Sequence, residues 1–221
     1  VNKETNYVAG LPGKSGDPSP VTAYGVYVGM KACAKAQFGS DSLEGKKVGV
    51  QGAGHVGQYL IKHLKDEGAD IFVTDIHEPS LKEVSKKYGA KIIGLDEIYD
   101  LDMDIYAPCA LGATVNDDTL NRLKCSIIAG AANNQLKDEA VHGEIVMEKG
   151  IIYAPDYMLN AGGVINCFAE VDNRTAEWAM DKAGQIYDTT INIINGSKEN
   201  NIPTYAIANK MAEDRIKDAQ K

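Results

Sequence analysis

The sequence lacks the cysteine and histidine patterns that mark common metal and redox sites. It has four cysteines and four histidines in 221 residues, but they form no CxxC pair, no HExxH motif and no cluster with metal-ligand spacing. We therefore expect no metal, and reduced thiols that are small buried residues rather than nucleophiles. The positions are Cys33, Cys109, Cys125, Cys167, His55, His63, His77 and His142.

The sequence also lacks an excess of positive charge and any long hydrophobic run. Lys and Arg total 23 against 31 Asp and Glu, and the net charge of −8 argues against a nucleic-acid or anionic-membrane partner. No apolar run approaches the roughly 18 residues that a membrane span requires, and the first residues do not resemble a signal peptide. With 44% hydrophobic and 24% charged residues, the composition is typical of a globular protein, and we expect a cytoplasmic location.

What the sequence does contain is a glycine-rich turn between two apolar runs. Lys46–Gln51 is expected to be a strand, Gly52-Ala53-Gly54-His55-Val56-Gly57 follows it, and helical periodicity comes next. A second apolar run, Ile71–Thr74, ends at the carboxylate of Asp75. A glycine motif alone is weak evidence in a chain with 22 glycines. This order of elements is typical of a dinucleotide-binding unit, and an ordinary βαβ unit with a glycine-rich turn is the alternative.

Each part of the turn has a separate expected role in holding the cofactor. Gly52 permits the sharp turn, Gly54 lets a pyrophosphate approach the backbone, and Gly57 lets the helix pack against the sheet. The start of that helix, at His55 and Val56, presents unpaired N–H groups and a positive dipole to an anion. The turn therefore predicts phosphate binding without any basic side chain.

Asp75 is expected to select the cofactor, with Ile76 beside it. A carboxylate at the end of the second strand accepts hydrogen bonds from both ribose hydroxyls and repels a 2′-phosphate. His77 and Lys82 are the nearest basic residues, and neither is next to Asp75 in the sequence. The sequence therefore favours NAD over NADP.

The periodicity along the chain predicts an α/β fold with additional C-terminal helices. Strands alternate with helices up to residue 159, which indicates a doubly wound parallel sheet of the Rossmann type, and the pattern is helical from residue 160 onward. We expect a linker over 1–19, an NAD-binding domain over 20–159 and closing helices over 160–221. The further expected strands are 91–93, 104–107, 126–129 and 151–154. The expected helices are 20–38, 79–88, 96–99, 117–123, 138–148, 161–171, 175–194 and 203 to the C-terminus, with Ser19 as an N-cap and Gly196 as a break.

Four further segments resemble one enzyme family over nearly the whole chain. They are Pro18–Gly25, Ala107–Gly112, Ala132–Leu136 and Ala154–Val164. Their motifs are similar to those of the amino-acid dehydrogenases that act on leucine, phenylalanine, valine and glutamate, the leucine enzymes above all. The resemblance implies NAD-dependent oxidative deamination of an L-amino acid to a 2-oxo acid and ammonia, in a homo-oligomer of two-domain chains.

The resemblance also implies that this chain lacks catalytic residues. The family's glycine-rich motif with its catalytic lysine, a second lysine and a catalytic aspartate belong to a substrate domain, and none has a counterpart here. The implied contribution of this chain is binding. Thr22 resembles the residue that holds the nicotinamide carboxamide, Cys109 and Ala110 resemble the loop along the adenosine, and Asn133 resembles the residue that orients the carboxamide.

Three residues are candidates for the amino-acid substrate. Asn134 resembles the asparagine that reaches the substrate carboxylate, although an Asn pair after a strand is also typical of a turn. Val164 and Cys167 resemble residues that line the side-chain pocket, and both are small and apolar, which suits a branched aliphatic substrate. Core packing is the alternative for these two residues.

Two other functions remain open on the sequence alone. A non-catalytic NAD-binding or sensing module would fit the missing lysines. A Rossmann-type methyltransferase would also place an acidic residue at the end of a second strand, but the segments Asn133-Asn134 and Gly162–Val164 have no evident role in methyl transfer.

Overall fold

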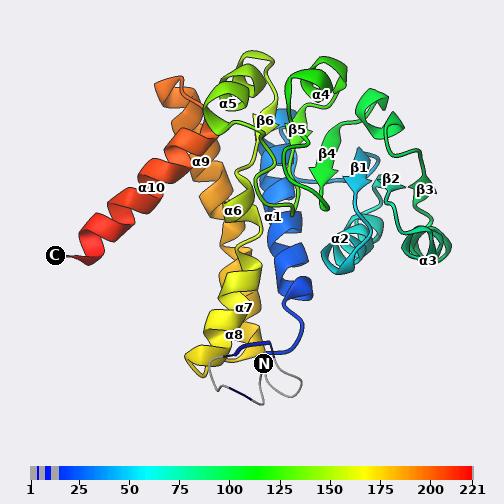
Figure 1. The fold of residues 1–221 in the computed structure, drawn as a ribbon. Helices are drawn as coiled ribbons and strands as arrows, with labels where there is room; N and C mark the ends of the chain where they lie inside the picture. Colours follow the sequence, from blue (N-terminus) through cyan, green and yellow to red (C-terminus); the bar gives the residue numbers. More distant parts are fainter. Residues whose placement is uncertain (1–3, 5–7, 11–14, 221) are drawn as a thin grey trace.

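A six-stranded sheet forms the centre of the molecule, with the strand order β3-β2-β1-β4-β5-β6 (Figure 1). The computed structural model describes residue 4, residues 8–10 and residues 15–220. All neighbouring strands are parallel, which confirms the predicted α/β Rossmann-type class. The strands are β1 (Lys47–Gln51), β2 (Asp70–Thr74), β3 (Lys91–Ile92), β4 (Ile105–Pro108), β5 (Ile127–Ile128) and β6 (Ile152–Tyr153).

Helices cover both faces of this sheet. They are α1 (Ser19–Phe38), α2 (His55–Asp66), α3 (Glu78–Tyr88), the 3₁₀ helix η1 (Glu97–Asp100), α4 (Asp117–Arg122), α5 (Glu139–Glu148), α6 (Asp156–Leu159), α7 (Gly162–Val171), α8 (Ala176–Gly184), α9 (Ile186–Asn200) and α10 (Thr204–Ala219). None that the structure describes is both long and apolar enough to cross a membrane.

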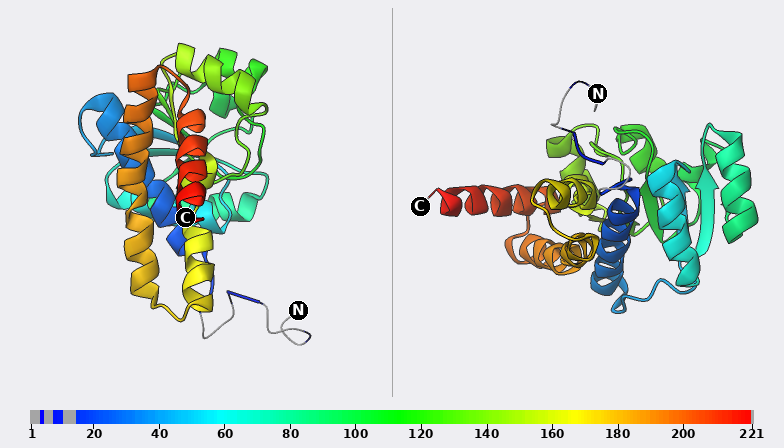
Figure 2. Two further views of the ribbon diagram at one scale, coloured as in Figure 1. Left: turned by 90° about the vertical axis from the view of Figure 1, so that its left-hand side faces the viewer. Right: turned by 90° about the horizontal axis from the view of Figure 1, so that it is seen from below.

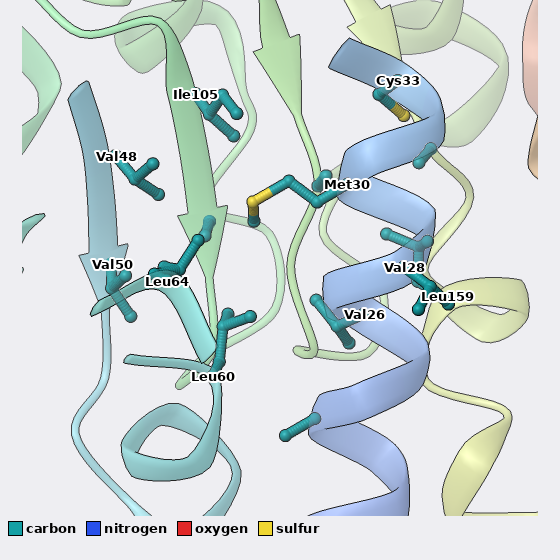
Figure 3. Close-up of a cluster of buried hydrophobic side chains, with 14 of the residues drawn as sticks. Val26, Val28, Met30, Cys33, Val48, Val50, Leu60, Leu64, Ile105 and Leu159 are labelled. Carbon is teal, nitrogen blue, oxygen red and sulfur yellow. The ribbon is translucent and has the colours of Figure 1, made fainter. Parts of the chain in front are cut away.

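Alternating side chains of the strands feed two separate cores. Ile105 of β4 belongs to the larger core, in which α1 and α2 pack on the sheet, as the side chains in Figure 3 illustrate. The next residue, Tyr106, belongs to the smaller core under η1, α4 and α5. Because successive strand side chains point to opposite faces, both faces of the sheet are buried, as a doubly wound fold requires.

The long helix α1 joins the sheet to the C-terminal helices. It packs against α2 on one side and against α7, α8 and α9 on the other. Gly29 of α1 allows a close approach of α6 and α9, because a Cβ there would lie 2.1 Å from Cδ2 of Leu159 and 3.3 Å from Oγ1 of Thr190. The last helix, α10, starts against β6 and extends away from the body of the molecule (Figure 2).

Several predicted boundaries were wrong. The first helix begins at Ser19, and the Ser19 hydroxyl donates to Asp17 Oδ1 at 2.6 Å instead of capping the helix. The predicted helix 175–194 is two helices, because the hydrogen bonding is interrupted at Gln185. Gln185 keeps right-handed helical angles (φ −67°, ψ −10°), so the periodicity of the sequence does not register the interruption.

Gly196 does not break α9, which continues to Asn200 and ends with Asn201 in the left-handed conformation at φ 52°. A Cβ at Gly196 would lie 3.1 Å from Cγ2 of Ile207, so the glycine permits α10 to pack closely on α9. The short helix α6 was not predicted at all. Of the predicted linker, residues 1–3, 5–7 and 11–14 lie outside the described residues, and residues 15–18 precede α1 without forming a helix or strand.

Candidate functional site

The sheet brings most of the predicted site residues to one edge. Gly52 follows β1, Asp75 follows β2, Cys109 follows β4, and Asn133 lies in the segment after β5. Because all strands run parallel, their carboxyl ends share one edge, and the strand order reverses between β1 and β4. Ligands of doubly wound folds bind at this kind of switch point.

The glycine-rich turn is closed by backbone contacts on two sides and open on the third. Gly52 has φ +114°, and a Cβ there would lie 2.9 Å from the backbone of Cys109. A Cβ on Gly57 would lie 2.1 Å from the carbonyl oxygen of Gly52, so this glycine packs the helix on the turn itself. A Cβ on Gly54 would meet nothing within 4 Å. The turn therefore leaves its open side at Gly54, where a pyrophosphate is expected.

Asp75 holds the turn through its carboxylate. Its Oδ2 accepts a hydrogen bond from Ala53 N–H at 2.6 Å, and its Oδ1 accepts one from His77 N–H at 2.8 Å. The carboxylate is half-buried, whereas Ile76 beside it is 86% exposed. The structure thus brings the Asp75 carboxylate beside the turn, and its expected role toward a ribose stays a prediction. The hydrogen bond between Ala53 and Asp75 joins the glycine-rich turn to the end of β2, and the spacing of these residues in the sequence does not reveal it.

His55 connects the turn to the segment before α1. Its Nδ1 lies 3.5 Å from Oδ2 of Asp17, and both side chains are exposed. Hydrogen bonds from Ser19 lower the pKa of the Asp17 carboxyl, and the proximity of His55 adds to this. Val56, the next residue of α2, is half-buried against the larger core. His55, directly after Gly54, is thus exposed at the start of α2.

The loops after β4 and β5 are joined to each other by backbone hydrogen bonds. Ala113 N–H donates to the carbonyl oxygen of Asn134 at 2.7 Å, and Val115 N–H donates to that of Gln135 at 2.9 Å. Asn134 has φ +53°, a conformation that Asn tolerates better than most residues. The backbone of Asn134 therefore forms a turn, as the alternative interpretation of the Asn pair predicted. Its side chain is exposed.

Asn133 is exposed at the same edge and is held by a residue far along the chain. Its Oδ1 accepts a hydrogen bond from Nδ2 of Asn160 at 2.6 Å, and the same Nδ2 donates to the carbonyl oxygen of Ala131 at 3.1 Å. This pairing leaves the Asn133 amide nitrogen as the side chain's remaining donor. Asn160 lies within the family motif Ala154–Val164, but no feature of the sequence indicated this contact.

Thr22 lies where the first turn of α1 meets the start of α7. It is buried, and its hydroxyl donates to the carbonyl oxygen of Pro18 at 2.9 Å. A Cβ on Gly162 would lie 2.3 Å from the carbonyl oxygen of Val21, and one on Gly163 would lie 3.0 Å from Thr22 Oγ1. The two glycines therefore allow α7 to start against Thr22, and the segment 160–163 links Thr22 to Asn133.

Val164 and Cys167 occupy the first turns of α7 on its outer side. Val164 is 75% exposed, and Cys167 is half-buried. The core-packing alternative therefore fails for Val164. Phe168 and Val171 continue the exposed apolar strip, at 51% and 74% exposure.

The cysteines divide into two groups. Cys33 and Cys125 are buried as predicted, but Cys109 and Cys167 are only half-buried, so the prediction of buried cysteines was wrong for these two. Although the residue as a whole is half-buried, its thiol is shielded from water, and this desolvation raises the pKa of the Cys109 thiol to about 11. A thiol with this pKa is protonated near neutral pH. Cys109 is therefore unsuited to act as a nucleophile. Its neighbour Ala110 is exposed.

Across the described part of the chain, no three His, Cys, Asp or Glu side chains could hold a metal ion together.

Comparison with known proteins identifies the family. The model of the Glutamate/Leucine/Phenylalanine/Valine dehydrogenase family matches residues 13–77 and 73–221. Leucine dehydrogenase from Thermoactinomyces intermedius is 53% identical over 219 residues, which cover 98% of this chain and 60% of that enzyme. The chain belongs to this dehydrogenase family. It spans about 60% of the length of the curated leucine dehydrogenases that it matches.

Relatives with other substrates match as well. L-tryptophan dehydrogenase from Nostoc punctiforme is 43% identical over 100% of this chain and 63% of that enzyme. The crystal structure of a tryptophan dehydrogenase from that organism superimposes with a TM-score of 0.90 at 42% identity, covering 99% of this chain and 63% of that one. The hetero-hexameric glutamate dehydrogenase from Thermus thermophilus, at 19% identity and a TM-score of 0.72 over 92% of this chain and 53% of its own, shows the shared fold alone.

The family uses a pyridine nucleotide, and the residues at the sheet edge fit one. The backbone at Gly54 is open to an approaching diphosphate, since a Cβ there would meet no heavy atom within 4 Å. Asp75 supplies carboxylate acceptors at the end of β2. This dehydrogenase chain also contains polar residues that the sequence analysis missed, namely Gln135 and Asp156. No motif marks them, because their role depends on contacts across the fold.

Proposed function

We propose that this chain is the NAD-binding part of an oxidoreductase that deaminates a branched-chain L-amino acid such as leucine to its 2-oxo acid and ammonia. In this proposal residues 20–159 form the cofactor domain, residues 160–221 form the closing helices, and residues 1–19 lead from a substrate domain. The observation that carries the proposal is the Ala53–Asp75 hydrogen bond of 2.6 Å beside the open side of Gly54. This geometry supports the recognition of the diphosphate and of the ribose at adjacent positions.

The chain's own residues would bind and orient the cofactor. The N–H groups at the start of α2 would hold the diphosphate, and Asp75 would accept hydrogen bonds from the hydroxyls of the adenosine ribose. Cys109 and Ala110 would line the adenosine, while Thr22 and Asn133 would hold the carboxamide. The nicotinamide, when bound, accepts hydride from the amino acid. Proton transfer is assigned to residues of a substrate domain, because this chain has no counterpart of the catalytic lysine motif.

The expected substrate class follows from the start of α7. Val164 and Cys167 are small and apolar, and Val164 faces outward, where it would meet an aliphatic side chain of a bound amino acid. Asn134, exposed at the sheet edge, would reach the substrate carboxylate. Relatives that act on leucine, tryptophan and phenylalanine all match this chain, so the choice among apolar amino acids depends on these pocket residues.

The test is a titration of the chain with NADH and NADPH, followed by calorimetry or fluorescence. We expect NADH to bind at least tenfold more tightly than NADPH, because Asp75 repels the 2′-phosphate. Asp75→Asn should weaken NADH binding by about tenfold and narrow the difference between the two cofactors. Asp66→Asn, an exposed carboxylate at the far end of α2, is the matched control and should change neither affinity.

Equal binding of NADH and NADPH by the unaltered chain would contradict the choice of NAD. Absence of binding of either nucleotide would overturn the proposal as a whole. With leucine and NAD added to the same sample, we expect no formation of NADH. Turnover by the chain alone would disprove the assignment of proton transfer to another domain.

A further inference from the structure

Both ends of the short helix α6 are hydrogen-bonded to the loop that carries Asn133 and Asn134. Asp156, its first residue, accepts a hydrogen bond from the backbone N–H of Gln135. Asn160, directly after its last residue, donates to the side chain of Asn133. The four-residue helix α6 and the residue that follows it thus contact the loop at two positions, one residue before and one residue after Asn134.

The Asp156 contact is made by a buried carboxylate. Asp156 is 7% exposed, and its Oδ2 accepts from Gln135 N–H at 2.9 Å and from the Tyr153 hydroxyl at 3.0 Å. Burial, and then the adjacent Asp156, raise the pKa of Tyr153, so the phenol keeps its proton and remains a donor. A buried acceptor without a donor is costly, so this arrangement fixes the position of the Gln135 backbone.

Gln135 transmits this position to the rest of the loop. It is fully buried, and its Nε2 donates to the carbonyl oxygens of Gly130 and Ala132, both at 2.9 Å. Gly130 itself has no room for a side chain, since a Cβ would lie 2.2 Å from the carbonyl oxygen of Pro108. The loop from 130 to 135 is thereby pinned at its start, its middle and its end.

The helix α6 is itself anchored on distant parts of the fold. Leu159 is fully buried and packs against Gly29 of α1. Thr204, the first residue of α10, donates its hydroxyl hydrogen to the carbonyl oxygen of Tyr153 at 2.6 Å. Because α6 is fixed by α1 and by the strand before it, it can hold the loop in place and is not carried along by it.

We propose that α6 positions the amide loop for the nicotinamide half of the cofactor, with Asp156 acting through Gln135 and Asn160 acting through Asn133. Both are positioning residues and touch neither cofactor nor substrate in this assignment. Asn160 keeps Oδ1 of Asn133 occupied, so the Asn133 amide nitrogen is presented as a donor to the carboxamide oxygen. The inference rests on the proposed function, because it takes Asn133 as the residue that meets the nicotinamide.

The test compares NADH with ADP-ribose, which lacks the nicotinamide and would bind only through the glycine-rich turn, Asp75 and the adenosine loop of Cys109 and Ala110. In the unaltered 221-residue chain we expect NADH to bind more tightly than ADP-ribose. Asp156→Ala should weaken NADH binding by about tenfold and leave the affinity for ADP-ribose within about twofold. Asp156→Asn retains an oxygen that can accept both hydrogen bonds, so it should restore NADH binding.

Two further variants separate positioning from general damage to the core. Tyr153→Phe removes one donor to Asp156 but keeps the bond to Gln135, so it should lower the thermal midpoint without changing the ratio of the two affinities. Asn160→Ala lies at a half-buried position and should reproduce the selective loss of NADH binding, which keeps the inference testable if Asp156→Ala does not fold.

The outcomes also separate this inference from the proposed function. Equal weakening of NADH and ADP-ribose, or no change in either, by both Asp156→Ala and Asn160→Ala would overturn the inference. The inference would also be overturned if Tyr153→Phe changed the ratio of the affinities for NADH and ADP-ribose as strongly as Asp156→Ala does. If the unaltered chain binds neither ligand, the proposed function itself fails. If it binds both equally, the dinucleotide site stands, and the assigned role of Asn133 and α6 fails.

Discussion

The two halves of the sheet edge are built in different ways. In the turn half, at the ends of β1 and β2, the hydrogen bonds come from backbone groups and from Asp75 within one short βαβ unit, and the backbone of Cys109 closes the turn on its other side. In the loop half, at the ends of β4 and β5, the contacts come from Gln135, Asp156 and Asn160, which lie on different elements. A site made from local backbone is marked by glycines, whereas a site held by distant side chains has no comparable sequence signature.

Because of this difference, we expect substitutions in the two halves to have different consequences. The turn half depends on the absence of side chains, so any added atom acts directly on it. The loop half depends on hydrogen bonds that a conservative replacement can retain. The helix α1 is common to both halves, since it packs on α2 and on α7.

The largest effect is expected from two glycines of the same turn. Gly52→Ala places a side chain at φ +114°, 2.9 Å from the Cys109 backbone, and should lower the free energy of unfolding by about 2–3 kcal/mol. Gly54→Ala meets no atom within 4 Å and should leave stability within about 0.5 kcal/mol, yet reduce NADH affinity by more than about tenfold because the methyl occupies the diphosphate position.

Urea unfolding and NADH titration of both variants measure this pair of effects. A Gly54→Ala chain that binds NADH normally would show that the open side of the turn is not the phosphate site. An equally stable Gly52→Ala chain would contradict the close contact between β1 and β4.

A smaller effect is expected at the contact between α1 and α2, which supports the turn half. Glu67 accepts hydrogen bonds from the Tyr27 hydroxyl at 2.5 Å, from Lys31 Nζ at 2.6 Å and from Leu43 N–H at 3.2 Å. Burial raises the pKa of Glu67, but the three hydrogen bonds outweigh it, and the net pKa lies below the usual 4.5. The folded state therefore favours the ionised form, and this contribution is present above about pH 4.5 and lost as the pH falls through the lower folded value.

Glu67→Gln should accordingly cost about 1 kcal/mol near pH 7 and progressively less below about pH 4. Chemical unfolding of both chains across this pH range gives the difference directly. A difference that stays constant or grows towards acid would show that ionisation of Glu67 does not stabilise the contact. Glu83→Gln on the exposed side of α3 is the control and should show little difference at any pH.

The smallest effect is expected at the outer side of α7. Val164→Ala removes a side chain that is 75% exposed, so the free energy of unfolding should change by less than about 0.5 kcal/mol. NADH affinity should also remain unchanged, because Val164 is assigned to the amino-acid side chain. A clear loss of NADH binding, measured by titration, would show that Val164 belongs to the cofactor site and not to the substrate pocket. The cofactor site would then extend beyond the two halves of the sheet edge to α7.

The sequence predicted the turn half in detail because its physics is local. The positions of Gly52, Gly54 and Asp75 follow from the need for a sharp turn, a free backbone and an acceptor at the end of the second strand. The parallel order of strands followed from the alternation of helical and strand periodicity. Predicted helix boundaries were wrong where tertiary contacts determine the helix ends. At Gly196, for example, α9 continues through the glycine, and α10 packs closely against this position.

The loop half could be approached only through family motifs. These indicated Asn133 and Asn134, but the left-handed conformation of Asn134 and the hydrogen bond from Asn160 became visible only in the structure. The helix α6 has four residues, too few for periodicity to reveal. Its role depends on a buried carboxylate whose partner, Gln135, lies more than one element away.

The sequence by itself thus determined the fold class, the glycine-rich turn and the carboxylate that follows β2, because each is a property of one short segment. Only the tertiary structure decided how the turn is closed against Cys109, which side of it is open, and how α6 holds the amide loop. The physical reason is that buried hydrogen bonds and close backbone contacts join residues far apart in the chain, and no periodicity or spacing records such pairs.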